Sequence, residues 1–461
     1  MAEQTLSEVL AEFALGLNFR DIPADTLTHA KQHALDLVGV SLGVSASETA
    51  RTVRKTIGRL GGKAECTVIG SARKYPAPLA ALANATMAHT PDFDDTHGGS
   101  IIHPSAVTVP TALATAEALG ADGKSLLTAL VAGYEVLLRL GLMAPGKFHP
   151  RGFHPTVVCG VFGAAVTAGK LKRLPAKTLC HALGICGSQA SGILEFLADG
   201  SSTKRIHPGW ASLSGMIAVM LAQDGLTGPR TVLEGRFGLL KSFVGEGGEI
   251  PEGVINNLGN RWETNFISYK PYPCCHHLMA FIDCIRALNK RERIPLEEIV
   301  QVEGIISQDQ ADLVCTPREA KLAPRTPYDA KFSLPYVVGV TLLRGKCGLG
   351  DFTPRAIQDK KVLELAQKVT HTISDQTGFP RVFPGWVKIK LKNGTVLEHR
   401  EMVNRGGPEN PLSEEEIIDK FESNALLVLP LRKVKEIEEK ILNMEGLRNI
   451  QSLVKDLGLK K

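Results

Sequence analysis

The sequence predicts a mainly α-helical protein, in which both chain ends build one large all-helical domain and a smaller α+β domain is inserted into it. Three observations lead there. Apolar residues recur at helical spacing up to about residue 266 and again beyond residue 400. Between these regions the pattern is that of strands and turns. A chain of 461 residues also exceeds one ordinary hydrophobic core. We therefore expect a helical domain of residues 1–266 and 400–461, and an α+β domain of residues 267–399.

The N-terminal part reads as a succession of helices. Leu6, Val9, Leu10, Phe13 and Leu17 recur at helical spacing. Proline at a first turn and glycine after a last turn mark further starts and stops. The predicted helices cover residues 30–40, 49–60, 78–89, 105–119, 126–142, 157–169, 176–192 and 211–223. Several are rich in Ala, Gly and Ser, so their axes can approach closely.

The insert and the C-terminal part carry clearer local signals. Residues 299–307 alternate as a strand does, and Val387, Ile389 and Leu391 share one face of another strand. Asn393-Gly394 supplies a two-residue hairpin turn. Ser413 and Glu416 form a capping box, and the stretches 434–442 and 447–457 are amphipathic helices.

The bulk composition excludes several classes of protein. A net charge of +5 over this length, without a basic patch interleaved with aromatics, gives no support for nucleic-acid binding. The first residues lack the layout of a signal peptide, and the uncharged apolar runs are too short to span a membrane. Nine cysteines include no Cys-x-x-Cys pair, which argues against zinc ribbons and iron–sulfur clusters. We expect a cytoplasmic protein without a zinc ribbon or an iron–sulfur cluster.

The chemistry-bearing residues centre on the stretch 91–105. It holds Asp92, Asp94, Asp95, His97 and His103 between two small-residue helices. Burying so many ionisable groups is costly unless they are paired or functional. The motif His103-Pro104-Ser105 recurs as His154-Pro155-Thr156, again before an apolar run.

The two repeated motifs predict two neutral imidazoles. Proline is favoured at the first helical position, so each histidine falls at or near an N-cap. There the helix dipole disfavours imidazolium, and a neutral ring can accept a proton. Removing a proton beside a carboxylate needs such a base, together with cations that hold the substrate. Lys204, Arg205, His207 and Lys270 are the candidate clamps.

Structural alternatives stand beside this interpretation. A histidine at a helix start often has no catalytic role, and Asp94 and Asp95 could simply cap or solvate a loop. Asp92, Asp94, Asp95, His97 and His103 could together hold a divalent metal, although no established ligand spacing is present. Cys275 beside His276 could be a nucleophile, but no third partner is evident.

Five motifs together resemble the MmgE/PrpD family, which includes 2-methylcitrate dehydratase, cis-aconitate decarboxylase and iminodisuccinate epimerase. They are Asp92-Phe93-Asp94-Asp95-Thr96, His103-Pro104-Ser105, Gly152-Phe153-His154-Pro155-Thr156, Thr203-Lys204-Arg205 and Lys270-Pro271-Tyr272-Pro273-Cys274. The resemblance runs from about residue 5 to past residue 345 with the motifs in family order. It implies a helical domain with an α+β lid, a homodimer, and cofactor-independent chemistry on di- or tricarboxylates.

The resemblance also implies which residues form the site. Asp92, His103, His154, Lys204 and Lys270 match catalytic positions, and Thr96 matches a substrate-binding position. Arg205, His276 and Tyr336 are further substrate-binding candidates. The sequence departs from the decarboxylase branch in two places: the loop between Thr96 and His103 is one residue longer, and Cys275 replaces a histidine five residues after Lys270.

Three reactions share the same opening step, and the residues separate them poorly. A hydro-lyase acting on a substrate such as 2-methylcitrate is the first expectation, and the departures from the decarboxylase branch argue against decarboxylation. Epimerisation of a dicarboxylate such as iminodisuccinate is the next, followed by decarboxylation of cis-aconitate. A non-catalytic carboxylate-binding protein would keep Lys204 and Lys270 but would not need His103 and His154.

Overall fold

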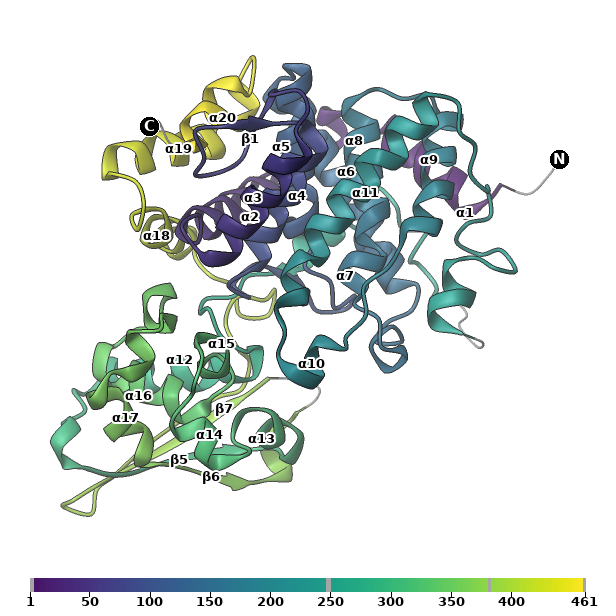
Figure 1. Cartoon of the computed structure of the whole chain (residues 1–461). Coiled ribbons are helices and arrows are strands. Elements are labelled where there is room, and N and C mark those ends of the chain that lie inside the picture. Colours follow the sequence, from purple (N-terminus) through teal and green to yellow (C-terminus); the bar gives the residue numbers. More distant parts are fainter. Residues whose placement is uncertain (1–3, 246–249, 380–382, 459–461) are drawn as a thin grey trace. The chain divides into compact units, whose positions relative to one another are not determined.

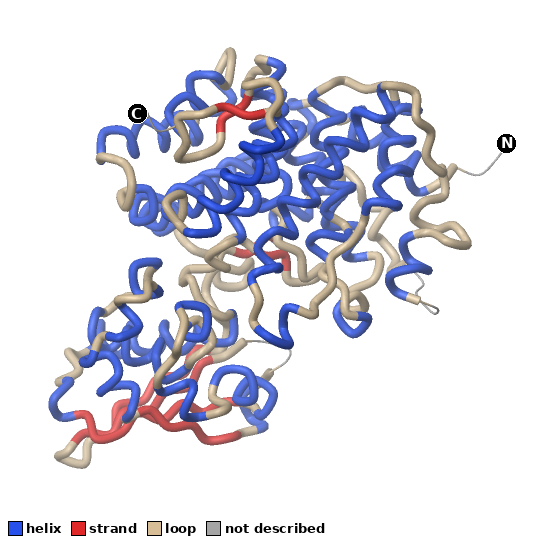
Figure 2. The backbone as a smooth tube through the Cα atoms, viewed as in Figure 1, coloured by secondary structure: helices blue, strands red, loops and turns tan. Residues whose placement is uncertain are grey.

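The computed structural model describes residues 4–245, 250–379 and 383–458, and the chain is mainly α-helical (Figures 1 and 2). It divides into two compact units. Unit 1 combines residues 1–268 with residues 413–461, and unit 2 comprises residues 269–412. The breaks therefore fall at 268/269 and 412/413, where the sequence predicted 266/267 and 399/400.

Unit 1 is an assembly of helices from both chain ends. Its N-terminal helices include α1 (Leu6–Gly16), α2 (Ala24–Gly43), α3 (Glu48–Leu60), α4 (Ala77–His89), α5 (Ser105–Leu119) and α6 (Gly123–Leu142). They continue with α7 (Pro155–Val158), α8 (Gly160–Leu171), α9 (Ala176–Gln189), α10 (Phe196–Asp199) and α11 (His207–Gln223). The C-terminal helices are α18 (Glu414–Ala425), α19 (Leu431–Leu442) and α20 (Gln451–Leu457). Two-stranded pairs β1 (Cys66–Thr67)–β2 (Lys74–Tyr75) and β3 (Thr96–His97)–β4 (Ile267–Ser268) complete it.

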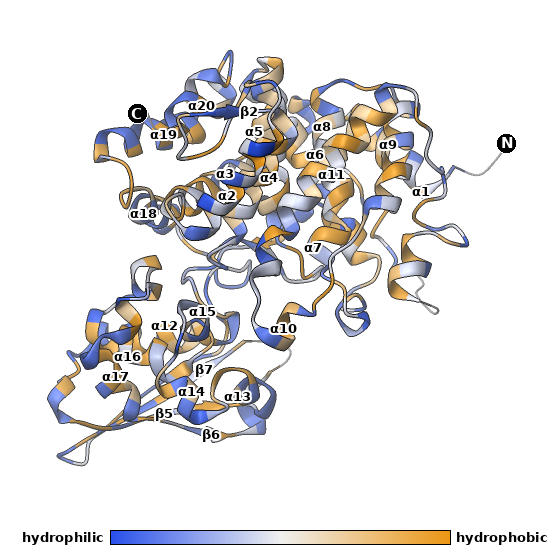
Figure 3. Ribbon diagram, in the orientation of Figure 1, coloured by the Kyte–Doolittle hydropathy of each residue, from blue (hydrophilic) through white to orange (hydrophobic). Residues whose placement is uncertain are grey.

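Small residues let the central helices of unit 1 approach closely, as predicted. Helix α11 packs against α4 and α8. A Cβ atom added at Gly215 of α11 would lie 2.5 Å from the carbonyl oxygen of Val161 in α8. Figure 3 shows apolar residues concentrated on these central helices. Any larger residue at Gly215 would force α8 and α11 apart, at a cost typical of overpacking.

Helix α6 carries two buried charges that fasten a later segment. It is long and apolar enough to cross a membrane by length and composition, but 89% of that stretch is buried within the protein. Its Glu135 carboxylate accepts hydrogen bonds from the backbone N–H groups of Glu263 (3.1 Å) and Thr264 (2.9 Å). Arg139 pairs with Glu135 and donates to the carbonyl oxygen of Arg261 at 2.6 Å. These contacts place β4, which pairs with β3 of the stretch 91–105, called the acidic loop below.

The C-terminal helix α18 fastens the acidic loop from another side. Lys420 is buried and its ammonium lies 2.7 Å from Asp36 of α2. The same ammonium donates to the carbonyl oxygen of Phe93 at 3.0 Å and lies 3.9 Å from the centre of the Phe93 ring. Burial raises the pKa of Asp36 to about 6, although Lys420 opposes the shift. Residues far apart in sequence thus hold the loop together.

Unit 2 is built on a four-stranded sheet with the order β6-β5-β7-β8. Its strands are β5 (Ile299–Ile306), β6 (Val369–Ile373), β7 (Gly385–Leu391) and β8 (Val396–Glu401). Strands β5 and β6 are parallel, and the other pairs are antiparallel. The helices are α12 (Met279–Arg291), α13 (Gln308–Val314), α14 (Arg318–Leu322), α15 (Pro327–Ala330), α16 (Leu334–Arg344) and α17 (Lys360–Gln367). Helix α12 packs against β7 and β8.

Most predicted elements occur where the sequence placed them. The strand at 299–307, the hairpin with its Asn393-Gly394 turn, and the capping box at Ser413 are all present. The apolar run 157–169 is interrupted at Cys159, between α7 and α8. The next residue, Gly160, lies close to α11, because a Cβ added there would be 3.0 Å from the Cβ of Ala211.

Candidate active site

The two repeated motifs start helices in unit 1, as the sequence predicts. His154 is the N-cap residue of α7, with Pro155 in the first turn. His103 lies two residues before Ser105, the first residue of α5. The motifs also touch each other, because the backbone N–H of His103 donates to the Thr156 hydroxyl at 3.1 Å. One motif therefore helps to position the other.

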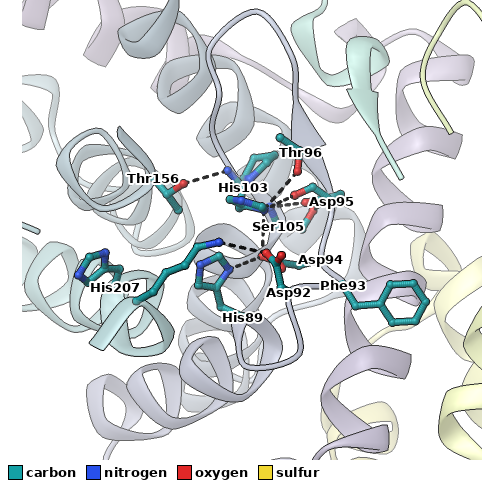
Figure 4. Close-up of polar contacts among 12 residues, drawn as sticks. His89, Asp92, Phe93, Asp94, Asp95, Thr96, His103, Ser105, Thr156 and His207 are labelled. Carbon is teal, nitrogen blue, oxygen red and sulfur yellow. Dashed lines mark hydrogen bonds and ion pairs between the residues drawn. The ribbon is translucent and has the colours of Figure 1, made fainter. Parts of the chain in front are cut away.

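Three buried imidazoles meet at this point, two of them predicted and one not. Figure 4 shows two of them, His89 and His103, beside the aspartates of the acidic loop. The ring centres of His103 and His154 are 6.2 Å apart. His89, the last residue of α4, has its ring centre 4.8 Å from that of His103 and 5.8 Å from that of His154. Sequence analysis missed His89. It could have been predicted from its position, because it is a titratable residue at the end of an Ala-rich helix, directly before the acidic loop.

The ring of His103 is oriented by the acidic loop. Its Nδ1 lies 2.9 Å from the carbonyl oxygen of Asp95, 3.2 Å from the Thr96 hydroxyl and 3.4 Å from the Asp94 carboxylate. A carbonyl oxygen only accepts hydrogen bonds, so Nδ1 carries the proton of the neutral ring. Nε2 then holds the lone pair that a general base requires.

The ring of His154 is oriented differently, by a second histidine. Its Nδ1 lies 3.0 Å from Nδ1 of His207, the first residue of α11. Burial, together with His89, Lys204 and His103, holds the pKa of His154 well below its usual value. Burial lowers the pKa of His207 to about 4. Both rings are neutral near pH 7, and one proton between the two Nδ1 atoms decides whether Nε2 of His154 accepts or donates.

The neutral state of His154 has a cause that differs from the predicted one. The helix dipole was expected to disfavour imidazolium at both motifs. Helix α7 has only four residues, and the causes of the shift are burial and neighbouring cationic groups. The neutral ring agrees with the prediction, and a contribution of the dipole at His154 stays a prediction.

The three aspartates of the acidic loop have separate partners. The Asp92 carboxylate lies 3.0 Å from the Lys204 ammonium, and Asp92 itself has a left-handed backbone with φ of 53°. Asp94 lies 2.7 Å from Nδ1 of His89. Asp95 lies 2.9 Å from Nδ1 of His33 and accepts from the backbone N–H of Ser105 at 3.2 Å. A left-handed aspartate is an uncommon conformation that often marks a functional loop.

The metal set considered from the sequence does not come together. Asp92 pairs with Lys204, Asp95 faces His33 and Ser105, and His97 contacts Ser100 (2.9 Å) and Glu263 (3.3 Å). Because these three residues turn to different partners, the five predicted ligands do not form one metal-binding group. Among the described residues, His89, His103 and His154 instead form the group whose ligand atoms lie close together, within 4.8 Å of one another.

The remaining predicted site residues lie in several places. Thr96 is within the cluster, through its contact with His103. The Arg205 guanidinium donates to the Thr49 hydroxyl of α3 at 2.9 Å. Lys270 is buried near the start of unit 2, two residues beyond Ser268, which pairs with Thr96. Their roles in substrate binding stay predictions.

Two predicted binding residues lie within unit 2. The His276 ring packs edge-on against Phe383 at 4.5 Å between ring centres. Tyr336 is fully buried in α16, and its hydroxyl donates to the carbonyl oxygen of Asp351 at 2.5 Å. This hydrogen bond accounts for the burial of Tyr336 without a ligand, and its binding role also stays a prediction.

The cysteines behave as buried apolar residues. All nine are reduced and buried. Burial raises the pKa of the thiols of Cys66 and Cys315 to about 12, so they carry little thiolate. They pack as small apolar residues do in a core.

Fold and site together define a helical protein with a buried acid–base cluster beside a lysine. Residues 8–249 match the MmgE/PrpD N-terminal domain, and residues 272–445 match the MmgE/PrpD C-terminal domain. The chain therefore belongs to the MmgE/PrpD family, as the motifs indicated.

Curated relatives extend over nearly the whole chain. A cis-aconitate decarboxylase of Aspergillus terreus is 28% identical over 481 residues, which cover 99% of this chain and 96% of that protein. The cis-aconitate decarboxylase of Mus musculus is 26% identical over 471 residues, covering 99% and 94%. That of Homo sapiens is 26% identical over 462 residues, covering 98% and 94%. An enzyme of the lyase type that acts on carboxylates fits these relatives.

Proposed function

We propose that this protein is a cofactor-independent hydro-lyase that removes a proton beside a carboxylate of a di- or tricarboxylate such as 2-methylcitrate and expels water. One observation carries the proposal. Two buried imidazoles from separate segments lie 6.2 Å apart between ring centres, close to an aspartate–lysine pair. A base, an acid and an anion-binding cation are the parts that this reaction needs.

The proposed chemistry assigns one role to each group. A substrate carboxylate takes the place of Asp92 at the Lys204 ammonium. Nε2 of His103, whose Nδ1–H is held by Asp95, accepts the proton from the carbon next to the carboxylate. The carbon–oxygen bond at the neighbouring carbon breaks, and His154 protonates the departing hydroxide to give water. As His154 gives up its Nε2 proton, the proton of His207 moves to Nδ1 of His154. The starting state is restored when His103 releases to solvent the proton that it took from carbon and the His154–His207 pair takes one up.

Decarboxylation of cis-aconitate is the second candidate, and the relatives favour it. The names of the relatives from Aspergillus terreus, Mus musculus and Homo sapiens are cis-aconitate decarboxylase. There the same histidines would protonate the carbanion left by carbon dioxide. Cys275, where the decarboxylase branch has a histidine, favours the hydro-lyase. Epimerisation would need the two histidines on opposite faces of one carbon.

A single substrate panel tests the proposal. Purified, chelator-treated protein is incubated with 2-methylcitrate, citrate, cis-aconitate and iminodisuccinate. Ultraviolet absorbance reports formation of the unsaturated acid, released carbon dioxide reports decarboxylation, and deuterium uptake from solvent reports epimerisation. We expect dehydration of a hydroxy acid. Release of carbon dioxide alone would replace the hydro-lyase with the second candidate, and binding without turnover would identify a carboxylate-binding protein.

Assembly and compartment complete the proposal. We expect a cytoplasmic homodimer in which unit 2 acts as a lid and Lys270 contributes a second cation. Light scattering on the purified protein measures the mass against 49.6 kDa for one chain. A mass of one chain at working concentration would contradict the dimer.

A further inference from the structure

The three buried histidines have a feature that the proposed reaction does not use. Proton transfer employs His103 and His154 but assigns nothing to His89. Nε2 of His89 is buried and has no hydrogen-bond partner among the described residues. A buried ring nitrogen without a partner has lost its hydrogen bond to water and gained none in return, which is unfavourable. A ligand that accepts the His89 lone pair would remove this cost.

The other nitrogen of each ring is already held by a neighbour. Nδ1 of His89 contacts the Asp94 carboxylate at 2.7 Å. Nδ1 of His103 contacts the carbonyl oxygen of Asp95 at 2.9 Å, and Nδ1 of His154 contacts His207 at 3.0 Å. Metal-binding histidines almost always have the second ring nitrogen engaged in this way, usually with a carboxylate or carbonyl oxygen. In all three rings Nε2 is then the nitrogen suited to a ligand.

The spacing of the rings suits one small ion. With zinc–nitrogen distances of about 2.0–2.1 Å, the ring centres of three tetrahedrally placed histidines lie about 5 Å apart. The ring centres of His89 and His103 are 4.8 Å apart, close to this value. The ring of His154 lies 5.8 and 6.2 Å from the other two, so a small shift of His154 towards them would complete the geometry. Asp94, in contact with His89 and 3.4 Å from His103, offsets the charge of a cation, although Lys204 opposes it.

We propose that His89, His103 and His154 form a three-histidine binding site for a divalent transition-metal ion, with Zn²⁺ as the expected occupant. Neutral imidazoles are ordinary ligands of zinc. Bound Zn²⁺ takes the Nε2 lone pairs that proton transfer needs, so metal binding and catalysis exclude each other. The inhibitory consequence depends on the proposed function, but the binding itself does not.

Direct titration of the full-length protein tests binding without reference to activity. Chelator-treated protein is titrated calorimetrically with Zn²⁺, and Co²⁺ serves as a spectroscopic probe of a four-coordinate nitrogen site. We expect one ion per chain. His89→Gln should weaken Zn²⁺ binding by at least about 100-fold, and Asp94→Asn, which keeps all three ligands, by about 10–100-fold. His371→Gln, in β6 of unit 2, is the matched control and should bind as the parent does.

The outcomes separate the two claims. Equal Zn²⁺ affinity in the parent and His89→Gln would overturn the site, and so would the absence of one-per-chain binding. If His89→Gln does not fold, as judged by circular dichroism, Asp94→Asn and His154→Gln provide the same comparison. Zn²⁺ binding without any turnover of the substrate panel would reject the proposed function and keep the site. If turnover stays unchanged while Zn²⁺ is bound, the claim that metal binding prevents catalysis is rejected.

Discussion

The motifs His103-Pro104-Ser105 and His154-Pro155-Thr156 are nearly the same in sequence and differ in what surrounds them. His103 is held by oxygen atoms of the acidic loop, namely the Asp95 carbonyl and the Thr96 hydroxyl. His154 is held by the nitrogen of His207. A carbonyl oxygen allows one tautomer of the ring, whereas an imidazole allows either. Similar local sequences therefore start similar helices and provide different proton chemistry.

The largest expected effect is on turnover when either histidine is replaced. His103→Gln and His154→Gln should each lower kcat by about 100-fold or more, because each removes a group that transfers a proton. If both act in one step, the double variant should be little worse than the single ones. Steady-state kinetics on the substrate found in the panel measures this. Parent-like turnover in either variant would remove that histidine from the mechanism.

Replacing Lys204 tests the cation that lies near His154. Lys204→Ala should raise KM by about 10-fold or more with a smaller change in kcat, since the interaction with the substrate carboxylate is made before the transition state. Lys172→Ala is the control, because its ammonium donates to the side-chain oxygen of Gln223 and it is not a predicted site residue. An equal rise in KM for both variants would argue that the effect is a general loss of positive charge.

Replacing His207 should affect only the second motif. His207→Phe removes the nitrogen that orients His154, and we expect kcat to fall by about 10-fold while KM changes little. His207→Gln offers a donor and an acceptor again and should recover part of the loss. If Phe and Gln behave alike, the contact between the Nδ1 atoms does not matter for the reaction.

Acidification should lower the stability of the fold through Glu263, whose carboxylate contacts His97 of the acidic loop. Burial raises the pKa of Glu263, but hydrogen bonds from His97 and Arg261 outweigh it and lower the pKa to about 2. A lowered pKa contributes stability above the unfolded value of about 4.5, and this contribution is lost as pH falls towards 2. Glu263→Gln should therefore cost about 1–2 kcal/mol at pH 7 and less at pH 4, measured by urea unfolding. A cost that does not depend on pH would contradict the ion-pair explanation.

The smallest effect is expected at the contact between the two motifs. Thr156→Val removes the hydroxyl that accepts from the backbone N–H of His103 and should lower stability by about 1 kcal/mol. Thr111→Val is the control, since its hydroxyl donates to a carbonyl oxygen within α5. Thermal unfolding of both variants measures the difference. We expect kcat to change only in Thr156→Val, by a few-fold.

Local patterns predicted the helices well because their causes are local. Proline and small residues define the starts of α5 and α7, and the capping box at Ser413 defines α18. The convergence of His103 and His154 followed from the repeated motif. His89 was not placed with them, and His207 was expected as a clamp for substrate and not as the partner of His154. Only packing of α4 and α11 brings these two residues to the same point.

The environment of each ionisable group was beyond local reasoning. Burial and cationic neighbours keep His154 neutral, and these depend on residues from α4, α11 and the segment around Lys204. The pairing of Asp92 with Lys204 joins residues that are distant in sequence. Patterns identified which residues carry chemistry, and the three-dimensional structure assigns their partners.

Lys420 has a consequence for how the protein is made. Its buried ammonium holds Phe93 of the acidic loop and Asp36, yet it belongs to the segment after residue 412. During synthesis the loop, its histidines and all of unit 2 leave the ribosome before Lys420 does. A nascent chain therefore lacks this support of the acidic loop until its last helices emerge, and we expect a chain that ends at residue 412 to hold Phe93 less firmly.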